Sequence, residues 1–306
     1  MLSDSVAPSA PLAFAAAEQG KTPRPRLSRL SDLLDAWEHE AQAAHEAHKG
    51  ATARGPLSGF ASLDRELGGC FSPGLHIVHG QPGSGKTAFA LQIAAQCGCP
   101  CLLLSCEMAP LELLRRHTAR VTGTYLGRLK SGELSPAESL SLARRACGAA
   151  PLLALADGTR AYASPSWLRD AALAAKGDEP HLLVVVDSVH SWAEGAGVEA
   201  SEYETLGAAI LGLRSLSHTL GCPVLAVSER NRDAMKGGGL SAGAGTRKIE
   251  YGAETVIDLT RDMTRRDDGA GEVEITLKLA KNRHGAAGRE LPFSFHGAKQ
   301  EFAPQA

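Results

Sequence analysis

The chain has 306 residues, a length that suggests one large domain or two ordinary ones. Hydrophobic residues make up 43% and charged residues 22%, the composition of a globular protein, and a net charge of −2 excludes attraction of nucleic acid by the overall field. No apolar run reaches the roughly 18 residues that a membrane helix needs, and the N-terminus lacks the pattern of a secretory signal. We therefore expect a cytoplasmic protein that contacts no membrane.

The seven cysteines, an odd number, are spread over apparent strands and helices, which favours reduced thiols over a disulfide framework. Cys97, Cys99, Cys101 and Cys106 lie close together in sequence, which leaves a metal site as an alternative. Their C-x-C-x-C spacing is not the paired spacing of a zinc site. Cysteine also packs as a small hydrophobic residue, so packing around the start of an apolar strand is the favoured interpretation.

The N-terminal part precedes any regular alternation of strands and helices. Residues 1–27 are rich in Ala, Pro and Ser without a period, and they predict a disordered tail. Over 28–49 apolar residues recur at helical spacing, so residues 28–54 are expected to form a separate helix and its connection. The apolar face of this helix needs a cover, either from its own domain or from a neighbouring subunit.

From residue 55 to residue 306, apolar strands alternate with helices. The expected strands are 75–79, 101–105, 182–187, 223–228, 254–260, 273–279 and 291–295, the last two paired. The expected helices are 86–96, 111–121, 136–148, 165–176 and 204–220. Such alternation predicts an α/β domain over 55–306 with a mostly parallel central sheet and helices on both faces.

A glycine-rich loop joins the first strand to the first helix of this domain. It has the pattern G-x-x-x-x-G-K-[ST], in which glycines let backbone N–H groups approach phosphates and the helix directs its positive end at the anion. Lys86 supplies a charge for the β- and γ-phosphates, and Thr87 offers a hydroxyl to Mg²⁺. The loop therefore predicts ATP binding. The expected contacts are Gly80, Gln81, Pro82, Gly83, Ser84, Gly85, Lys86, Thr87 and Ala88.

Two carboxylates follow apolar strands. Asp187 ends the strand 182–187 in the position of a Walker B aspartate, which predicts a contact to Mg²⁺. A helix-capping role for Asp187 is the alternative, because Ser188 follows it. Glu107 comes directly after the strand 101–105, and it should lie at the same carboxyl edge of the sheet, where ligands bind. We expect Glu107 to orient or deprotonate the attacking water.

Several segments in order resemble the C-terminal motor domain of DnaB-type replicative helicases, which are RecA-like P-loop ATPases. The similar segments are P-L-S-G-F-A-S-L-D-R-E-L-G-G at 56–69, S-C-E-M at 105–108, G-C-P-V-L-A-V-S-E-R-N-R at 221–232, I-E-Y-G-A-E at 249–254 and K-N-R-H-G at 281–285. The resemblance implies that Glu107 is the catalytic glutamate. It also implies that Lys281 and Arg283 reach the γ-phosphate of the neighbouring subunit, whereas the residues alone would indicate only a basic, solvated strand end.

The strand before residue 229 departs from the family. The family ends this strand in S-Q-x-N-R, and the glutamine senses the γ-phosphate and couples it to the DNA loops; here Glu229 stands in its place. A carboxylate at this position would repel the γ-phosphate unless Arg230, Arg232 or Mg²⁺ compensates. We therefore expect Glu229 to alter the coupling.

The resemblance further implies a ring, usually a hexamer, with ATP at the subunit interfaces and with the helix at 28–49 packed on the adjacent subunit. The residues before Gly55 are too few for the helical N-terminal domain that the family usually carries, so we expect neither that domain nor primase recruitment through it. Single-stranded DNA would contact the glycine-rich loop 231–248, and the uncharged stretch 240–245 makes a flexible surface loop the alternative. The basic residues of this loop are Arg232, Lys236, Arg247 and Lys248.

Two functions follow from the sequence. The first is an ATP-hydrolysing ring motor that resembles a DnaB-type DNA helicase and translocates on single-stranded DNA. The second is a regulatory or DNA-repair ATPase of the RecA-like class, in which the nucleotide state controls assembly and no duplex is unwound.

Overall fold

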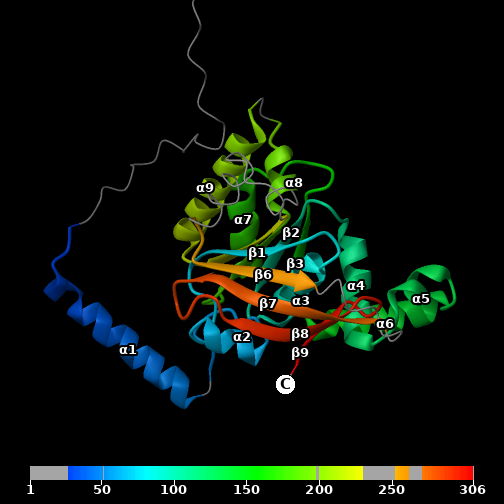
Figure 1. Ribbon diagram of the computed structural model, residues 1–306, viewed down its shortest axis with the longest axis horizontal. Coiled ribbons are helices and arrows are strands. Elements are labelled where there is room, and N and C mark those ends of the chain that lie inside the picture. The colour runs from blue at the N-terminus through cyan, green and yellow to red at the C-terminus, as the bar shows by residue number, and fades with distance from the viewer. Residues whose placement is uncertain (1–26, 51, 198–199, 230–251, 262–270, 306) are drawn as a thin grey trace, which may run out of the picture.

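The computed structural model describes residues 27–50, 52–197, 200–229, 252–261 and 271–305. In this part, one sheet of nine strands has the order β3-β2-β4-β5-β1-β6-β7-β8-β9 (Figure 1). The strands are β1 (Gly74–Gly80), β2 (Cys101–Ser105), β3 (Leu153–Asp157), β4 (Leu183–Asp187), β5 (Pro223–Glu229), β6 (Thr255–Arg261), β7 (Glu272–Asn282), β8 (Glu290–His296) and β9 (Glu301–Pro304).

The sheet has a parallel half and an antiparallel half. β1 to β6 pair in parallel, whereas β7, β8 and β9 continue the sheet beyond β6 as an antiparallel meander. β1, β2 and β4 are buried along their whole length, as expected for strands covered on both faces. The prediction of a mostly parallel central sheet is confirmed.

Helices cover both faces of this sheet. The helices that cover it are α2 (Ala61–Glu66), α3 (Lys86–Gln96), α4 (Pro110–Thr122), α7 (Pro165–Lys176), α8 (Val189–Glu194) and α9 (Glu202–Leu220). Two more, α5 (Leu126–Ser131) and α6 (Pro136–Ala149), pack on α4. One core packs α2, α3 and α4 against the sheet, and a second core packs α7, α8 and α9 against the other face (Figure 1). Alternate residues of β4 enter the two cores, since Val185 lies in the first and Val184 and Val186 in the second.

A helix precedes the domain and extends away from it (Figure 1). The expected helix at 28–49 begins as a 3₁₀ turn (Leu30–Leu33) and continues as α1 (Leu34–Lys49), which has no buried residue. Leu30 is 88% exposed and Trp37 is 74% exposed, so the apolar face that the sequence predicts is present and open. The predicted tail at 1–27 lies, except for Leu27, outside the described residues.

Five elements of the structure were not predicted. α2, α5 and α8 have six residues each, which is too short for a helical period to be seen. β3 is an edge strand and is only partly buried, so its mixture of Leu and Ala lacks the continuous apolar character of β4. β9 has four residues and, among the strands that the structure describes, pairs only with β8.

Candidate nucleotide site

The glycine loop lies between β1 and α3, as the motif predicts. Gly85 takes a φ of 86° immediately before the helix, and a Cβ there would come 2.9 Å from Cζ of Phe302. Only glycine fits this position, because its backbone is left-handed and a buried aromatic ring lies against it. The N-terminus of α3 therefore opens onto the loop with its first backbone N–H groups available to an anion.

Lys86 is the first residue of α3, and its side chain reaches back into the loop. Its Nζ donates to the carbonyl oxygens of Gly80 at 3.0 Å and Gln81 at 3.2 Å, and it lies 3.9 Å from Oε1 of Glu229. Burial lowers the pKa of this ammonium, and the carboxylates of Glu229, Glu107 and Asp187 oppose that shift. The ammonium is therefore held inside the loop with three carboxyl groups near it.

Asp187 ends β4 beside the first turn of α3. Burial raises the pKa of its carboxyl group to about 6, and a hydrogen bond from the Thr87 side chain acts in the opposite direction. Ser188 is the N-cap of α8, and its hydroxyl accepts from the N–H of Ser191 at 3.4 Å. The helix cap is thus Ser188, and the carboxyl group of Asp187 points to Thr87, which is the pair of groups expected at a Mg²⁺ ion.

Glu107 lies next to Asp187, because Ser105 and Asp187 are partners in the register of β2 and β4. Two hydroxyls donate to Oε1 of Glu107, that of Ser188 and, at 3.1 Å, that of Ser191. These hydrogen bonds orient the carboxylate beside the cavity. The sequence analysis did not identify the two serines as site residues, although both follow Asp187 within four residues.

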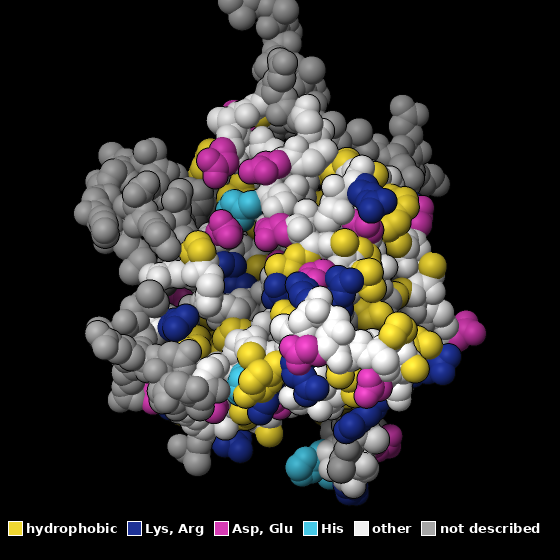
Figure 2. Space-filling model, turned by 90° about the vertical axis from the view of Figure 1, so that its right-hand side faces the viewer, with side chains coloured by type: hydrophobic (Ala, Val, Ile, Leu, Met, Phe, Trp, Pro, Cys, Tyr) yellow, Lys and Arg dark blue, Asp and Glu magenta, His cyan; other side chains and the backbone are white. Residues whose placement is uncertain are grey.

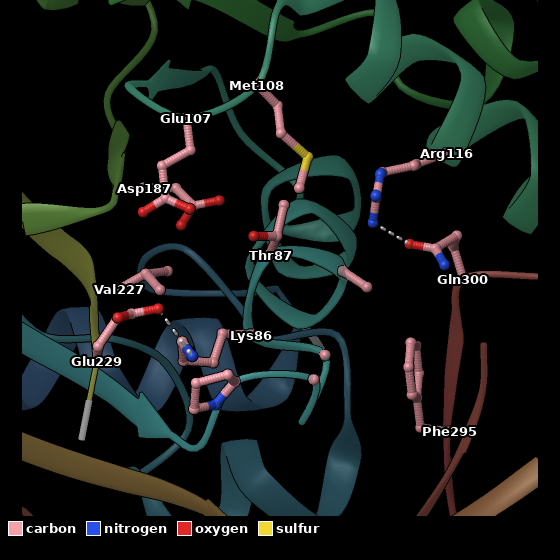
Figure 3. A pocket seen from close by; sticks show the side chains of 14 residues that line it. Lys86, Thr87, Glu107, Met108, Arg116, Asp187, Val227, Glu229, Phe295 and Gln300 are labelled. Carbon is pink, nitrogen blue, oxygen red and sulfur yellow. Dashed lines mark hydrogen bonds and ion pairs between the residues drawn. The ribbon is translucent and has the colours of Figure 1, made fainter. Parts of the chain in front are cut away.

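A cavity of about 320 Å³ joins these groups (Figure 3). At one end lie Glu107, Asp187 and Glu229, whereas Arg116, Phe295 and Gln300 form the opposite side (Figure 3). Nη1 of Arg116 donates to Oε1 of Gln300 at 2.7 Å. Sequence reasoning missed this second side, since it combines α4, β8 and the turn before β9.

The chemistry of the loop fits a polyphosphate. Oγ of Ser84 is buried and has no hydrogen-bond partner in the part of the chain that the structure describes. Ser84 lies beneath the loop, whereas Lys86, Gly85 and the first turn of α3 line one end of a cavity that is large enough for a small ligand. The expected nucleotide contacts from Gly80 to Ala88 all belong to β1, this loop or the first turn of α3.

The structure does not bring Lys281 and Arg283 to this cavity. β7 runs antiparallel to β6, and Lys281 is paired with Val256 near the start of β6, whereas Gly80 is level with Leu259. The N–H of Arg283 donates to the Glu254 carbonyl at 3.0 Å, and Nη1 donates to Oε1 of Glu254 at 3.1 Å. From the level of residue 254 to that of residue 259 is about 17 Å along a strand. Arg283 therefore lies at the opposite edge of the sheet from Lys86.

The rim of the cavity is acidic. On this face, Asp and Glu side chains gather around a histidine (Figure 2). Burial lowers the pKa of His190, while its acidic neighbours raise it; they are Glu229, Glu202, Glu194 and Glu107. The N–H of Glu229 donates to Nδ1 of His190 at 3.4 Å. The carboxylate that replaces the family glutamine thus belongs to a larger acidic surface.

The remaining predictions fall elsewhere. Arg232, Lys236, Arg247 and Lys248 lie outside the described residues. Within the described residues, no group of three or more His, Cys, Asp or Glu side chains could hold a metal ion, and no helix is long and apolar enough to cross a membrane. Sγ of Cys97 lies 3.9 Å from Sγ of Cys99, and both thiols pack on the first core.

Solved structures with the same fold include ATPases. One solved ATPase domain matches with a TM-score of 0.75 at 20% identity, covering 92% of this chain and 100% of that one. A DnaB-like replicative helicase, solved with its interactions with primase, matches with a TM-score of 0.72 at 19% identity over 91% of this chain and 67% of that one. A KaiC-like protein from Pyrococcus horikoshii OT3 matches with a TM-score of 0.55 at 17% identity, covering 83% of this chain and 100% of that one. The fold and the glycine loop define a RecA-like P-loop ATPase domain.

The family follows from the sequence. The model of the DnaB-like helicase C-terminal domain matches residues 55–304, and the chain belongs to this family. The replicative DNA helicase DnaB of Nostoc sp. (strain PCC 7120) is 29% identical over 230 residues, which cover 72% of this chain and 26% of that protein. That of Treponema pallidum (strain Nichols) is 29% identical over 247 residues, which cover 78% of this chain and 54% of that protein. The chain thus spans about half the length, or less, of these relatives.

Proposed function

We propose that this domain is an ATP-hydrolysing ring motor that translocates on single-stranded DNA as a DnaB-type helicase. One observation carries the proposal. The residues that we assign to ATP binding and cleavage divide into two sets at opposite edges of the sheet, with Lys86, Glu107 and Asp187 in one set and Arg283 in the other. Such a division supports a site that is completed between two copies of the chain.

The first set would bind and activate the nucleotide. The loop from Gly80 to Ala88 would hold the phosphates, and Thr87 with Asp187 would hold Mg²⁺, whose charge would neutralise the phosphate oxygens. Glu107, oriented by the hydroxyls of Ser188 and Ser191, would position and deprotonate water. All of these groups come from one subunit.

The second set would act on the neighbour. Lys281 and Arg283 would stabilise the charge that develops on the γ-phosphate bound to the adjacent subunit. The exposed apolar residues of the N-terminal helix, Leu30 and Trp37 among them, favour a cover supplied by the adjacent copy. Both features support a closed ring, for which six subunits are the expected number.

Contact with single-stranded DNA is proposed for Arg232, Lys236, Arg247 and Lys248. The proposal depends on the family to which the chain belongs and on the glycine-rich sequence between these residues. A ring would repeat these few positive charges around a central channel, which strengthens contact with a phosphate backbone.

The test measures ATP hydrolysis with and without single-stranded DNA, together with strand separation of a forked duplex. We expect DNA to accelerate hydrolysis and ATP to drive unwinding, and we expect Arg247→Ala combined with Lys248→Ala to remove the acceleration. The matched control, Arg144→Ala combined with Arg145→Ala on α6, should keep it. If the protein hydrolyses ATP but does not bind single-stranded DNA at low salt, the proposed motor function is contradicted.

A second function is favoured by Glu229. A carboxylate in place of the γ-phosphate sensor suits an ATPase whose nucleotide state controls assembly without unwinding. Sedimentation of the protein with ATP, with ADP and without nucleotide tests this function. A change of oligomeric state with no strand separation would support it, and an unchanged state would reject it.

A further inference from the structure

The end of β5 places an acid against the phosphate loop. Glu229 is level with Gly80 in the register of β5 and β1, so its side chain starts beside the first residue of the loop. Oε1 of Glu229 lies 3.9 Å from Nζ of Lys86. In Figure 3 the two side chains meet at the end of the cavity that also holds Glu107 and Asp187.

The terminal phosphate of a bound nucleotide would compete with Glu229 for the ammonium of Lys86. The ammonium of a phosphate-loop lysine binds the β- and γ-phosphates, and here a carboxylate already interacts with it. Three carboxyl groups therefore face the ammonium of Lys86, those of Glu107, Asp187 and Glu229. A Mg²⁺ ion held by Thr87 and Asp187 would offset some of this charge. Glu229 lies on the next strand, β5, two residues beyond the register partner of Asp187.

The described neighbours of Glu229 do not supply a second cation. His190 meets the backbone N–H of Glu229 through Nδ1, which must be unprotonated to accept this hydrogen bond. Burial lowers the pKa of His190 and so favours its neutral form. Arg116 lines the same cavity, but it lies on the opposite side, where it is paired with Gln300 and Glu112.

We infer that Glu229 is a specificity-determining residue of the nucleotide site, which weakens the binding of a nucleoside triphosphate relative to a diphosphate. The inference rests on the proposed function in one respect, because it takes Lys86 as the ligand of the phosphates. The carboxylate pairs with Lys86 in the nucleotide-free protein and repels the terminal phosphate of ATP. ADP lacks that phosphate and keeps the remaining contacts of the loop.

As a consequence, the nucleotide site binds the product ADP more readily than the substrate ATP. After hydrolysis, the same repulsion acts on the cleaved phosphate and promotes its departure, while ADP stays bound. ADP should therefore inhibit this ATPase strongly, and ATP should have to displace Glu229 from Lys86 at each turnover.

The test compares Glu229→Gln with the wild type. Calorimetric titrations with Mg²⁺ measure the affinities for ADP and for a non-hydrolysable ATP analogue. Removing one like charge at this half-exposed position should tighten binding of the analogue by about tenfold, and of ADP by less than about threefold. Inhibition of ATP hydrolysis by ADP should weaken in parallel, which a purely structural role of Glu229 would not produce.

Matched variants make the result decisive. Glu202→Gln removes an acid that is close to His190 but not to Lys86, so the ratio of the two affinities should stay as in the wild type. Glu229→Ala serves as the second variant and should shift the ratio in the same direction. An unchanged ratio in both Glu229 variants, or an equal change for both nucleotides, overturns the inference.

The outcome also separates this inference from the proposed function. If Lys86→Ala binds both nucleotides as the wild type does, the phosphate loop is not the nucleotide site and both proposals fall. If DNA fails to accelerate hydrolysis while Glu229→Gln still shifts the ratio, the motor is rejected and the role of Glu229 stands.

Discussion

Two charged clusters lie at opposite edges of the same sheet, and they differ in sign and in burial. At the carboxyl edge, one ammonium, that of Lys86, faces three carboxyl groups and is itself only 10% exposed. At the amino edge, Arg283 and His284 share the single carboxylate of Glu254, and the Arg283 side chain is 51% exposed. The first cluster carries more negative than positive charge, whereas the second exposes positive charge on the surface. This difference supports an assembly in which the second cluster of one copy meets the first cluster of the next.

The largest effect is expected in the first cluster. Lys86→Ala should reduce ATP hydrolysis by about a thousandfold or more, because no other cation of the described cavity reaches that end of it. Steady-state phosphate release measures the loss. Lys278→Ala is the control, since its ammonium is paired with Glu290 on the surface of β7 and β8. Hydrolysis within tenfold of the wild type in Lys86→Ala would contradict the assignment.

Arg283→Ala tests the second cluster. Hydrolysis should fall by roughly a hundred- to a thousandfold, because an arginine that acts on the γ-phosphate contributes that much or more. Nucleotide binding measured by calorimetry should stay within about threefold. Arg289→Ala is the matched control, because Arg289 is paired with Glu66 close to the same turn.

A mixture of Lys86→Ala and Arg283→Ala tests whether the two clusters act together at the interface between two copies. In a mixed assembly, some interfaces join an intact Lys86 to an intact Arg283, so part of the hydrolysis should return. No recovery from a mixture that demonstrably co-assembles would place both residues in the same site or remove Arg283 from the reaction.

Much of the first cluster could be predicted from the sequence, whereas its surroundings could not. Asp187 ends an apolar strand, Glu107 follows one within two residues, and Lys86 follows one after the glycine loop. The ends of parallel strands meet at one edge. Arg116 and Gln300 are 184 residues apart, and no local pattern connects α4 with the turn before β9. The role proposed for Arg283 came from resemblance alone, because its position at the far edge depends on the antiparallel pairing of β7 with β6.

Two buried groups, Asp187 in the first cluster and His76 beneath the second, should respond to acid in opposite ways. Asp187 has its pKa raised by burial to about 6, so the folded protein takes up a proton that the unfolded chain binds only near pH 3.8. The free energy of unfolding therefore rises as the pH falls through this window. His76, beneath the second cluster near His284, has its pKa lowered by burial to about 4. Below pH 6.5 the unfolded chain binds this proton first, so His76 lowers the free energy of unfolding over a similar window.

Asp187→Asn should separate these effects. Asp187 and His76 each change the free energy of unfolding by on the order of 3 kcal/mol between about pH 6 and pH 4, with opposite signs. Without the carboxyl group of Asp187, the free energy of unfolding should fall with acid more steeply than in the wild type. Urea unfolding of the nucleotide-free protein at pH 7, 5.5 and 4.5 measures the slope. Asp170→Asn, at an exposed position beside Arg169, is the control, and equal slopes for Asp187→Asn and the wild type would reject the opposition.

The smallest effect is expected where the second cluster is held in place. Glu254 receives both the backbone N–H and the guanidinium of Arg283, but the ion pair is half-exposed, and such pairs contribute at most about 1 kcal/mol. Glu254→Ala should therefore lower hydrolysis by at most about fivefold, by loosening the orientation of Arg283. Glu254→Gln keeps an oxygen that can accept from Nη1 and should recover most of the rate. If Glu254→Ala instead accelerates hydrolysis, the carboxylate restrains Arg283 rather than positions it, and the contact of the second cluster with the neighbouring nucleotide is opposed by its own subunit.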